Sequence, residues 1–286
     1  MPQRITGHTE LIGLIATPIR HSKSPMMHNT AFEALGLDYA YLAFDFQPDR
    51  LEDAVKGLKA LGVKGWNVSM PYKTDIIPLL DEISEVSRLC ESVNTVINRD
   101  GKLYGTVTDG TGYMSALADQ GFDIKGKKMT VLGCGGAATA ICIQAALDGV
   151  KEISIFNAND SFFHRAEENA AKINANTGCV AHAYPLEDTE RLRAEIASSA
   201  LLANATNVGM GRLEGISLIT DKTMLRPDLI CTDVIYTPEE TAFLKLAKEA
   251  GCPTMNGTGM VLYQGAASFK LWTGMDMPID AVKAVL

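Results

Sequence analysis

The 286-residue sequence has no run of lysine or arginine, and its formal net charge is −8. Nucleic acids and anionic membranes are therefore not expected partners, because both bind proteins through clustered positive charge. The N-terminal segment "MPQRITGHTE" lacks the apolar core of a signal peptide, and no stretch approaches the length of a membrane span. We expect a cytoplasmic protein.

Metal-binding and disulfide patterns are also lacking. The six cysteines form no C-x-x-C pair and show no ligand spacing with the five histidines. This pattern predicts reduced, mostly buried thiols and no metal site. Hydrophobic residues make up 47% and charged residues 21% of the chain, which is typical of an ordinary globular protein long enough for two domains.

Apolar strand patterns alternate with helical patterns along nearly the whole chain, which predicts an α/β protein with a mostly parallel sheet. The segment "TDGTG" breaks the pattern near residues 109–112, and a second strand-helix series follows it. After Gly257 a helical pattern is followed by no further strand. We expect domains at 1–109 and 110–257, with the helical segment 258–286 returning to the first domain.

The segment "RHSKSP" places two hydroxyls, Ser22 and Ser24, one residue apart before a helical pattern that ends at Gly36. In an extended segment the two serines share a face, and the residue before a proline favours the extended region. Ser24 is therefore expected to be the N-cap of the helix. Two hydroxyls beside a helix N-terminus also suit an anionic substrate group.

The segment "GCGGAA" follows the strand pattern "KMTVL" and opens a helix. Gly133, Gly135 and Ala138 match the G-x-G-x-x-G/A pattern of dinucleotide-binding turns. The first glycine permits the tight turn, the second allows close approach of a pyrophosphate, and the alanine allows close packing of helix and strand. The ordered series of strand, turn, helix and second strand favours dinucleotide binding over a purely structural turn.

Four polar residues near predicted strand ends and turns are candidates for handling a proton or a substrate. They are Ser69, Lys73, Asn94 and Asp109. Taken singly, each has an ordinary structural explanation: a lysine is usually solvated, an aspartate before a helix is usually a cap, and an asparagine often lies in a turn.

Taken together, the motifs "PIRHSKSP", "NVSMPYK", "VNTV", "TDGTG", "LGCGGAA", "NATNVGM" and "GMVLYQGA" resemble the shikimate dehydrogenases. The forms "NVSMPYK", "TDGTGY" and "FNANDSFF" look most like the quinate/shikimate dehydrogenase branch. The resemblance spans nearly the whole chain. It implies an N-terminal substrate domain, a Rossmann NAD(P) domain, an active site between them, and hydride transfer to or from shikimate or quinate in aromatic amino acid biosynthesis.

The resemblance also assigns residues. Lys73 and Asp109 correspond to the catalytic pair. Ser22 and Ser24 would hold the substrate carboxylate, and Ser69, Asn94 and Gln264 would contact the ring hydroxyls. The cofactor residues would be Gly133, Cys134, Gly135, Gly136, Ala137, Asn157, Asp160, Asn207, Val234 and Gly257.

Cofactor choice depends on the segment after the second Rossmann strand. NADP-dependent relatives typically carry an arginine there, whereas this chain has Ala158. The stretch between Ala158 and Arg165 contains no lysine or arginine. Asp160 adds a carboxylate that would repel a 2′-phosphate, although it also suits a helix cap. We expect NAD to be preferred, with NADP as the second cofactor, and on resemblance alone we expect a homodimer.

Two other functions fit the same sequence patterns. Another two-domain NAD(P) dehydrogenase would share the architecture, and a cofactor-sensing regulator would keep the fold without the chemistry. The presence of both Lys73 and Asp109 favours an enzyme over the regulator. The sequence alone leaves the choice between quinate and shikimate open.

Overall fold

The computed structural model describes residues 5–20 and 22–286, and the chain divides into two compact units. The first unit is Met1–Thr108 with Leu262–Leu286, and the second is Asp109–Val261. The boundaries expected from the sequence assign Asp109 and residues 258–261 to the first domain, whereas this division gives them to the second unit. The later boundary falls inside the helix α10, Thr258–Thr273.

The first unit contains a six-stranded sheet in the order β2-β1-β3-β5-β6-β4. β1 is parallel to both β2 and β3, and β3, β5 and β6 are joined by antiparallel pairs. The hairpin predicted at Asp100-Gly101 is confirmed, because both residues have positive φ, 51° and 88°. The strands are β1 (Glu10–Ala16), β2 (Tyr39–Asp45), β3 (Gly65–Val68), β4 (Glu82–Ile83), β5 (Thr95–Arg99) and β6 (Lys102–Thr106).

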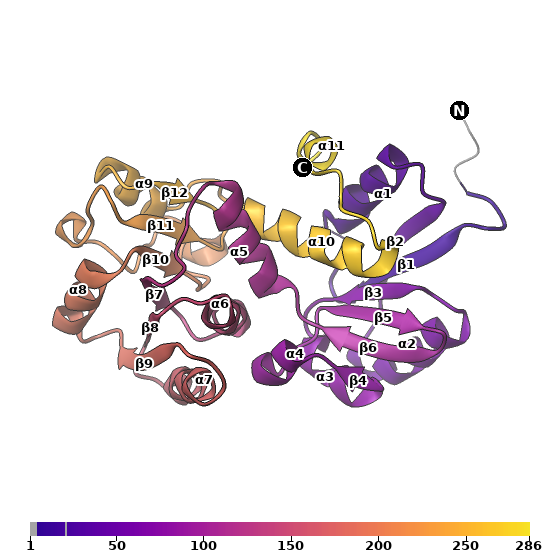
Figure 1. The fold of residues 1–286 in the computed structure, drawn as a ribbon, viewed down its shortest axis with the longest axis horizontal. Coiled ribbons are helices and arrows are strands. Elements are labelled where there is room, and N and C mark those ends of the chain that lie inside the picture. The colour runs from indigo at the N-terminus through magenta and orange to yellow at the C-terminus, as the bar shows by residue number, and fades with distance from the viewer. Residues whose placement is uncertain (1–4, 21) are drawn as a thin grey trace. The chain divides into compact units, whose positions relative to one another are not determined.

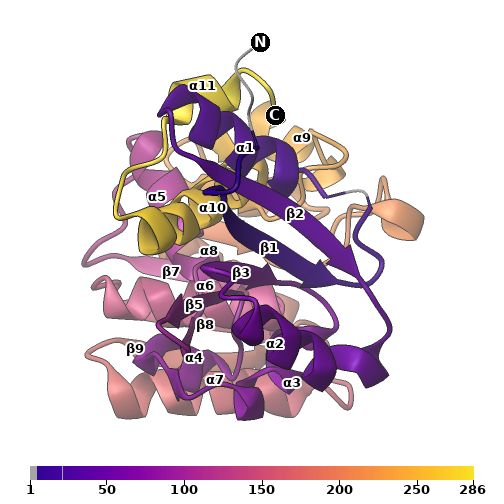
Figure 2. The same cartoon turned by 90° about the vertical axis from the view of Figure 1, so that its right-hand side faces the viewer.

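Helices cover both faces of this sheet (Figure 2). Ile12 and Leu14 of β1 belong to a core cluster with α1, α10 and α11, whereas Ile15 belongs to a cluster with α2 and α3. Successive side chains of a strand point to opposite faces, so one apolar strand contributes to both clusters. The helices of this unit outside α10 are α1 (Ser24–Ala34), α2 (Leu51–Ala60), α3 (Tyr72–Asp75), α4 (Glu85–Cys90) and α11 (Ile279–Lys283).

The second unit contains a fully parallel sheet in the order β12-β11-β10-β7-β8-β9. When the sheet is read from β9 to β12 and β7 is counted as strand 1, this is the 3-2-1-4-5-6 order of the Rossmann fold. The strand order reverses between β7 and β10. Ligands of such sheets bind outside the carboxyl ends of the strands at this switch point. The strands are β7 (Lys128–Leu132), β8 (Glu152–Asn157), β9 (Val180–Pro185), β10 (Leu201–Asn204), β11 (Ile230–Asp233) and β12 (Thr254–Met255).

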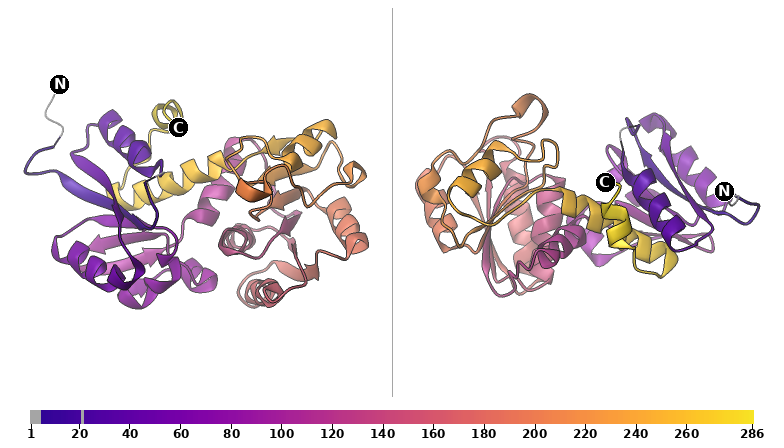
Figure 3. Two further views of the ribbon diagram at one scale, coloured as in Figure 1. Left: turned by 180° about the vertical axis from the view of Figure 1, so that it is seen from behind. Right: turned by 90° about the horizontal axis from the view of Figure 1, so that it is seen from above.

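In the second unit α8 and α9 lie on one face of the sheet and α5, α6 and α7 on the other (Figure 1). Phe243 and Leu244 of α9 pack with Leu192 and Ile196 of α8 in the core cluster of the first of these faces. Two further views show the sheet between its helices (Figure 3). The helices are α5 (Asp109–Asp119), α6 (Gly136–Leu147), α7 (Phe163–Asn176), α8 (Thr189–Ser198) and α9 (Ala242–Glu249).

Five of the six cysteines are buried, as the sequence predicts, and Cys90 is half-buried. In the part of the chain that the structure describes, no helix combines the length and the hydrophobicity needed to cross a membrane.

Candidate functional site

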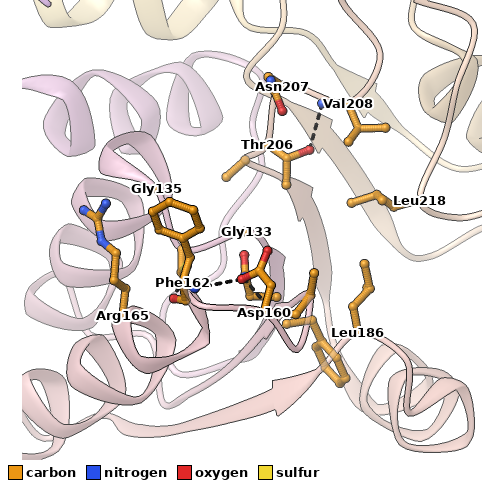
Figure 4. Close-up of a pocket in the computed structure, with 15 residues that line it drawn as sticks. Gly133, Gly135, Asp160, Phe162, Arg165, Leu186, Thr206, Asn207, Val208 and Leu218 are labelled. Carbon is orange, nitrogen blue, oxygen red and sulfur yellow. Dashed lines mark hydrogen bonds between the residues drawn. The ribbon is translucent and has the colours of Figure 1, made fainter. Parts of the chain in front are cut away.

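A cavity of about 530 Å³ lies in the second unit, at the carboxyl ends of β7, β8 and β10 (Figure 4). This is the switch point of the sheet, where a dinucleotide is expected. The cavity is lined by Gly133, Cys134, Gly135, Phe156, Asn157, Ala158, Asp160, Phe162, Arg165, Leu186, Ala205, Thr206, Asn207, Val208 and Leu218.

Gly133 makes the turn that closes one wall of the cavity. Its φ is +108°, a region that other residues rarely adopt, and a Cβ here would lie 2.8 Å from Cγ2 of Thr206. Its N–H donates to the carbonyl of Phe156, at 2.7 Å. The glycine is therefore required both by its backbone conformation and by the close approach of the segment after β10.

Gly135 and Gly136 face open space, since a Cβ at either position would meet no atom within 4 Å. Gly135 is the N-cap of α6, and the helix begins at Gly136. Free N–H groups and the helix dipole favour an anion at such an N-terminus, so these glycines fit a pyrophosphate. Ala138 is 1% exposed, as the predicted close packing requires.

Cys134 lines the cavity between the glycines but presents no reactive thiolate. Its Sγ donates to the carbonyl of Phe162, at 3.5 Å, and burial raises its pKa. A thiol that stays protonated contributes shape to the wall and no charge.

The turn after β8 brings Ala158 to the same cavity, and with it Asp160 and Arg165. Figure 4 shows the latter two side chains. Oδ1 of Asp160 accepts a hydrogen bond from the N–H of Phe162, at 2.8 Å. Helix α7 begins only at Phe163, with Phe162 in the N-cap position. The expectation that Asp160 caps the helix is therefore wrong: its carboxylate closes the turn that precedes the helix.

Sequence reasoning missed several cavity residues, notably Phe162 and Arg165. Arg165 lies three residues after Phe162, a spacing that places two side chains on one side of a helical turn. Its N–H donates to the carbonyl of Phe162, at 3.0 Å, so the turn is already helical there. That spacing was a usable signal. Leu186 and Leu218 come from distant segments and left no local signal.

Asn207 lines the cavity as expected, whereas Val234 and Gly257 do not belong to its lining. They lie together at another place in the unit. A Cβ on Gly257 would fall 2.0 Å from the carbonyl oxygen of Val234, and the N–H of Gly257 donates to the carbonyl of Ile235, at 2.9 Å. Only glycine permits this contact between the segments after β11 and β12.

A buried carboxylate organises the two loops beside the cavity. Oδ2 of Asp233, at the end of β11, accepts from Nδ2 of Asn204 at 3.1 Å and from Oγ1 of Thr241 at 2.8 Å. Oδ1 of Asn204 accepts from the hydroxyl of Thr206, at 2.7 Å. Burial raises the pKa of Asp233, and these donors oppose that shift. The network holds the segment that meets Gly133.

In the first unit, the serine loop follows β1 and departs from the predicted form. Lys23 is in the N-cap position with helical φ and ψ of −83° and −11°, and Ser24 is the first residue of α1. The predictions that Ser24 is the N-cap and that the two serines share an extended face are therefore wrong. Ser22 provides the hydrogen bond instead, because its Oγ accepts from the N–H of Ser24, at 3.2 Å. His21 lies outside the described residues.

Contacts with β2 hold α1 against the sheet. Nδ2 of Asn29 donates to the carbonyl of Tyr41, at 2.9 Å, and Oδ1 of Asn29 accepts from the N–H of Tyr41, at 3.0 Å. The hydroxyl of Tyr41, which is fully buried, donates to Oδ1 of Asn67, at 2.7 Å. The helix thus begins at Ser24 although a residue before proline favours the extended region.

A buried polar network connects the predicted substrate residues of this unit. Nδ2 of Asn67 donates to the carbonyl of Asn94, at 3.0 Å. The side-chain oxygen of Asn94 accepts from the N–H of Thr108, at 2.9 Å. Ser268 lies 2.7 Å from Thr95 through their hydroxyl oxygens and donates to the carbonyl of Gln264, at 3.0 Å. The network joins β3, β5 and α10.

Ser69 and Lys73 follow β3, whose carboxyl end lies beside that of β1 because these two strands are parallel. Val93 donates its N–H to the carbonyl of Lys73, at 2.8 Å, which ties the lysine to the segment that carries Asn94. The structure therefore places Ser22, Ser69 and Lys73 after adjacent carboxyl ends of one sheet. Asp109 is the first residue of α5 and belongs to the second unit.

No group of three or more histidine, cysteine, aspartate or glutamate residues within 5–20 and 22–286 could hold a metal ion.

Comparisons with known proteins agree on one family. The substrate-binding domain model of shikimate dehydrogenase matches residues 14–96, and the shikimate 5′-dehydrogenase C-terminal domain model matches residues 257–286. The chain is 58% identical over 284 residues to the shikimate dehydrogenase (NADP(+)) of Listeria monocytogenes serotype 4b, covering 99% of this chain and 98% of the relative.

Solved structures give the same result. The crystal structure of shikimate 5-dehydrogenase from Listeria monocytogenes in complex with shikimate and NAD matches with a TM-score of 0.97 and 57% identity, covering 100% of this chain and 99% of that one. Quinate dehydrogenase from Corynebacterium glutamicum in complex with NAD matches with a TM-score of 0.87 and 28% identity, covering 96% and 98%. The near-complete coverage and high identity show that this chain belongs to the shikimate dehydrogenase family.

Proposed function

We propose that this chain is an oxidoreductase that interconverts shikimate and 3-dehydroshikimate with a nicotinamide dinucleotide. The observation that carries the proposal is the 58% identity, across nearly the full length of both chains, to a protein named shikimate dehydrogenase. The glycine turn at the switch point of the second unit and the polar network of the first unit fit this activity.

The cavity fits the dinucleotide on three grounds. The open space around Gly135 and Gly136, the N-terminus of α6, and the position at the switch point each suit a pyrophosphate. Gly133 to Ala137 would hold the pyrophosphate, and Asn157, Asp160 and Asn207 would line the rest of the site. When bound, the nicotinamide ring accepts a hydride in oxidation and returns it in reduction.

Lys73 and Asp109 form the proposed catalytic pair. In oxidation, the neutral amine of Lys73 takes the proton of the reacting hydroxyl, and in reduction its ammonium donates a proton to the carbonyl oxygen. The same ammonium stabilises the negative charge that develops on that oxygen. Asp109 orients the lysine and accepts a hydrogen bond from the neighbouring hydroxyl.

The remaining substrate residues act by binding. Ser22 and Ser24 donate to the carboxylate of the acid, and Ser69, Asn94 and Gln264 position the ring hydroxyls. The hydrogen bonds to the side chain of Asn94 and to the backbone of Gln264 support this role, because binding groups act best when their own positions are held.

For the cofactor we propose that both dinucleotides are used and that NAD is preferred. Ala158 and Asp160 at the cavity support NAD, whereas Arg165 at the same cavity and the NADP(+) in the names of the sequence relatives support NADP. The test is kcat/KM for each cofactor at saturating shikimate. Equal or higher efficiency with NADP would refute the preference, and Ala158→Arg with Asp160→Ser should move the ratio toward NADP.

Quinate is the proposed second substrate, on the strength of the structural match to a quinate dehydrogenase. The decisive experiment mixes purified protein with shikimate or quinate and with NAD or NADP, and follows the absorbance of the reduced nicotinamide. No rise with either acid would refute the dehydrogenase proposal. Nucleotide binding without turnover would instead favour a cofactor-sensing regulator.

A homodimer is the proposed assembly. β2 is an edge strand of its sheet, and Leu42 on it is 51% exposed, which is the kind of surface that a second copy covers. Light scattering of the purified protein gives the mass directly, and a monomer at micromolar concentration would contradict the proposal.

A further inference from the structure

A second carboxylate touches the turn that borders the cofactor cavity. Glu187, in the loop between β9 and α8, accepts the N–H of Asn159 with both oxygens, at 3.2 and 3.1 Å. The neighbouring N–H of Leu186 donates to the carbonyl of Asn157, at 2.8 Å. The loop after β9 is thus docked on the turn after β8.

Three backbone donors of this turn are already taken. Asn159 donates to Glu187, Asp160 donates to the carbonyl of Ala158 at 2.8 Å, and Phe162 donates to the carboxylate of Asp160. Free N–H groups of a turn commonly bind phosphate oxygens. Here two carboxylates accept from donors that a phosphate would need.

The place of this turn gives the arrangement a consequence. Ala158 and Asp160 on either side of Asn159 line the cavity. In Rossmann folds the residues at the end of the second strand meet the adenosine ribose, whose 2′ position carries the extra phosphate of NADP. The added phosphate would therefore come near the carboxylate of Glu187 as well as that of Asp160.

We propose that Glu187 is a specificity-determining residue that disfavours NADP relative to NAD. Its carboxylate accepts the N–H of Asn159, as a bound anion would, and repels a 2′-phosphate. This inference rests on the proposed cofactor site and deepens it. Within the part of the chain that the structure describes, Glu187 forms no ion pair that would offset its charge.

The size of the effect follows from the position of Glu187. The residue is exposed, so water and salt screen its charge, and repulsion of a doubly charged phosphate at the surface corresponds to on the order of five-fold in relative affinity. A charge effect shrinks as ionic strength rises, whereas an altered loop conformation does not follow salt in this way.

The test compares three variants of the full chain by the ratio of kcat/KM with NADP to kcat/KM with NAD. Glu187→Gln removes the charge and keeps an acceptor for Asn159, so the ratio should rise about five-fold at low salt and less at high salt. Glu187→Ala also frees the N–H and should raise the ratio at least as much. Glu190→Gln, which removes an equal charge from the first turn of α8, should leave the ratio within about two-fold.

An unchanged ratio in both Glu187 variants, or an equal rise in Glu190→Gln, would overturn the inference. Calorimetric titration with NAD and with NADP gives the same comparison without turnover. A shifted binding ratio in a protein that oxidises no acid would refute the proposed reaction and support the role of Glu187. Failure of the wild type to bind either nucleotide would overturn both.

Discussion

The glycine turn after β7 and the serine loop after β1 follow parallel strands in their own units, yet they are held by different means. Backbone groups hold the glycine turn, since Gly133 donates to the carbonyl of Phe156 and packs against the segment of Thr206. Side chains hold the serine loop, through Ser22 on the N–H of Ser24 and Asp45 on the N–H of Ile19. The first site depends on one residue without a side chain, and the second on several particular side chains.

The largest expected effect concerns the chemistry of the first unit. Lys73→Ala should lower kcat by about two orders of magnitude or more, because a proton donor and acceptor used in the transition state is lost. The KM for shikimate should change much less. Steady-state kinetics with saturating cofactor measures both, and near-normal kcat with a raised KM would reduce Lys73 to a binding residue.

The next effect tests the backbone-built site. Gly133→Ala must adopt a φ of +108° and bring a Cβ to 2.8 Å from Thr206, a strain of about 2–3 kcal/mol. We expect this strain to appear either as a lower free energy of unfolding of the second unit or as a cofactor affinity that is weaker by roughly 30-fold or more.

Gly135→Ala is the matched control for Gly133→Ala. Its Cβ enters open space at ordinary φ, so the fold should be unaffected and any loss should appear only in cofactor binding. Thermal unfolding and calorimetric titration separate the two results, and equal stability of both variants would contradict the strain argument.

Acid should weaken the two units unequally, because only the first unit buries a histidine. His28 is stacked on Tyr41, at 4.5 Å between ring centroids, neither of its ring nitrogens has a hydrogen-bond partner among the described residues, and burial lowers its pKa to about 3. In the unfolded chain this histidine has a pKa near 6.5, so it binds a proton more readily there than in the folded protein. The contribution of His28 to the free energy of unfolding is therefore fully present above pH 6.5 and is lost as the pH falls below it, by about 2 kcal/mol between pH 7.5 and 5.

The acid effect is checked by hydrogen exchange measured by mass spectrometry at both pH values. Protection should fall first in α1 and α10, while the second unit, whose His164 and His182 are exposed, should change less. His28→Phe keeps an aromatic ring without a titrating group and should remove this part of the pH dependence. An unaltered pH profile in that variant would assign the acid sensitivity to other groups.

The smallest effect tests the side-chain-built site. Ser22→Ala removes a hydroxyl proposed to donate to the substrate carboxylate and known to accept from the N–H of Ser24. The KM for shikimate should rise about ten-fold, since a hydrogen bond to a charged group contributes about 1.5–3 kcal/mol. kcat should remain close to that of the wild type. An unchanged KM would leave Ser22 with its structural role alone.

Features set by neighbouring residues were predictable. The Asp100-Gly101 hairpin, the order of strands and helices, and the turn at Gly133 follow from period-2 and period-3.6 patterns and from glycine's access to positive φ. The start of α1 was not predictable in the same way, because the helix begins at Ser24 against the local preference of a residue before proline.

By itself, then, the sequence determined the α/β class and the glycine turn, since these depend on interactions within a few residues along the chain, and its resemblance to a known family supplied the candidate residues. Only the tertiary structure decided that Leu218 lines the cavity, that Asp233 holds the loop after β10, and that Glu187 reaches Asn159. Asn159 and Glu187 lie 28 positions apart. Their contact exists because β8 and β9 are adjacent in the sheet, and pairing between strands is settled by packing of the whole unit.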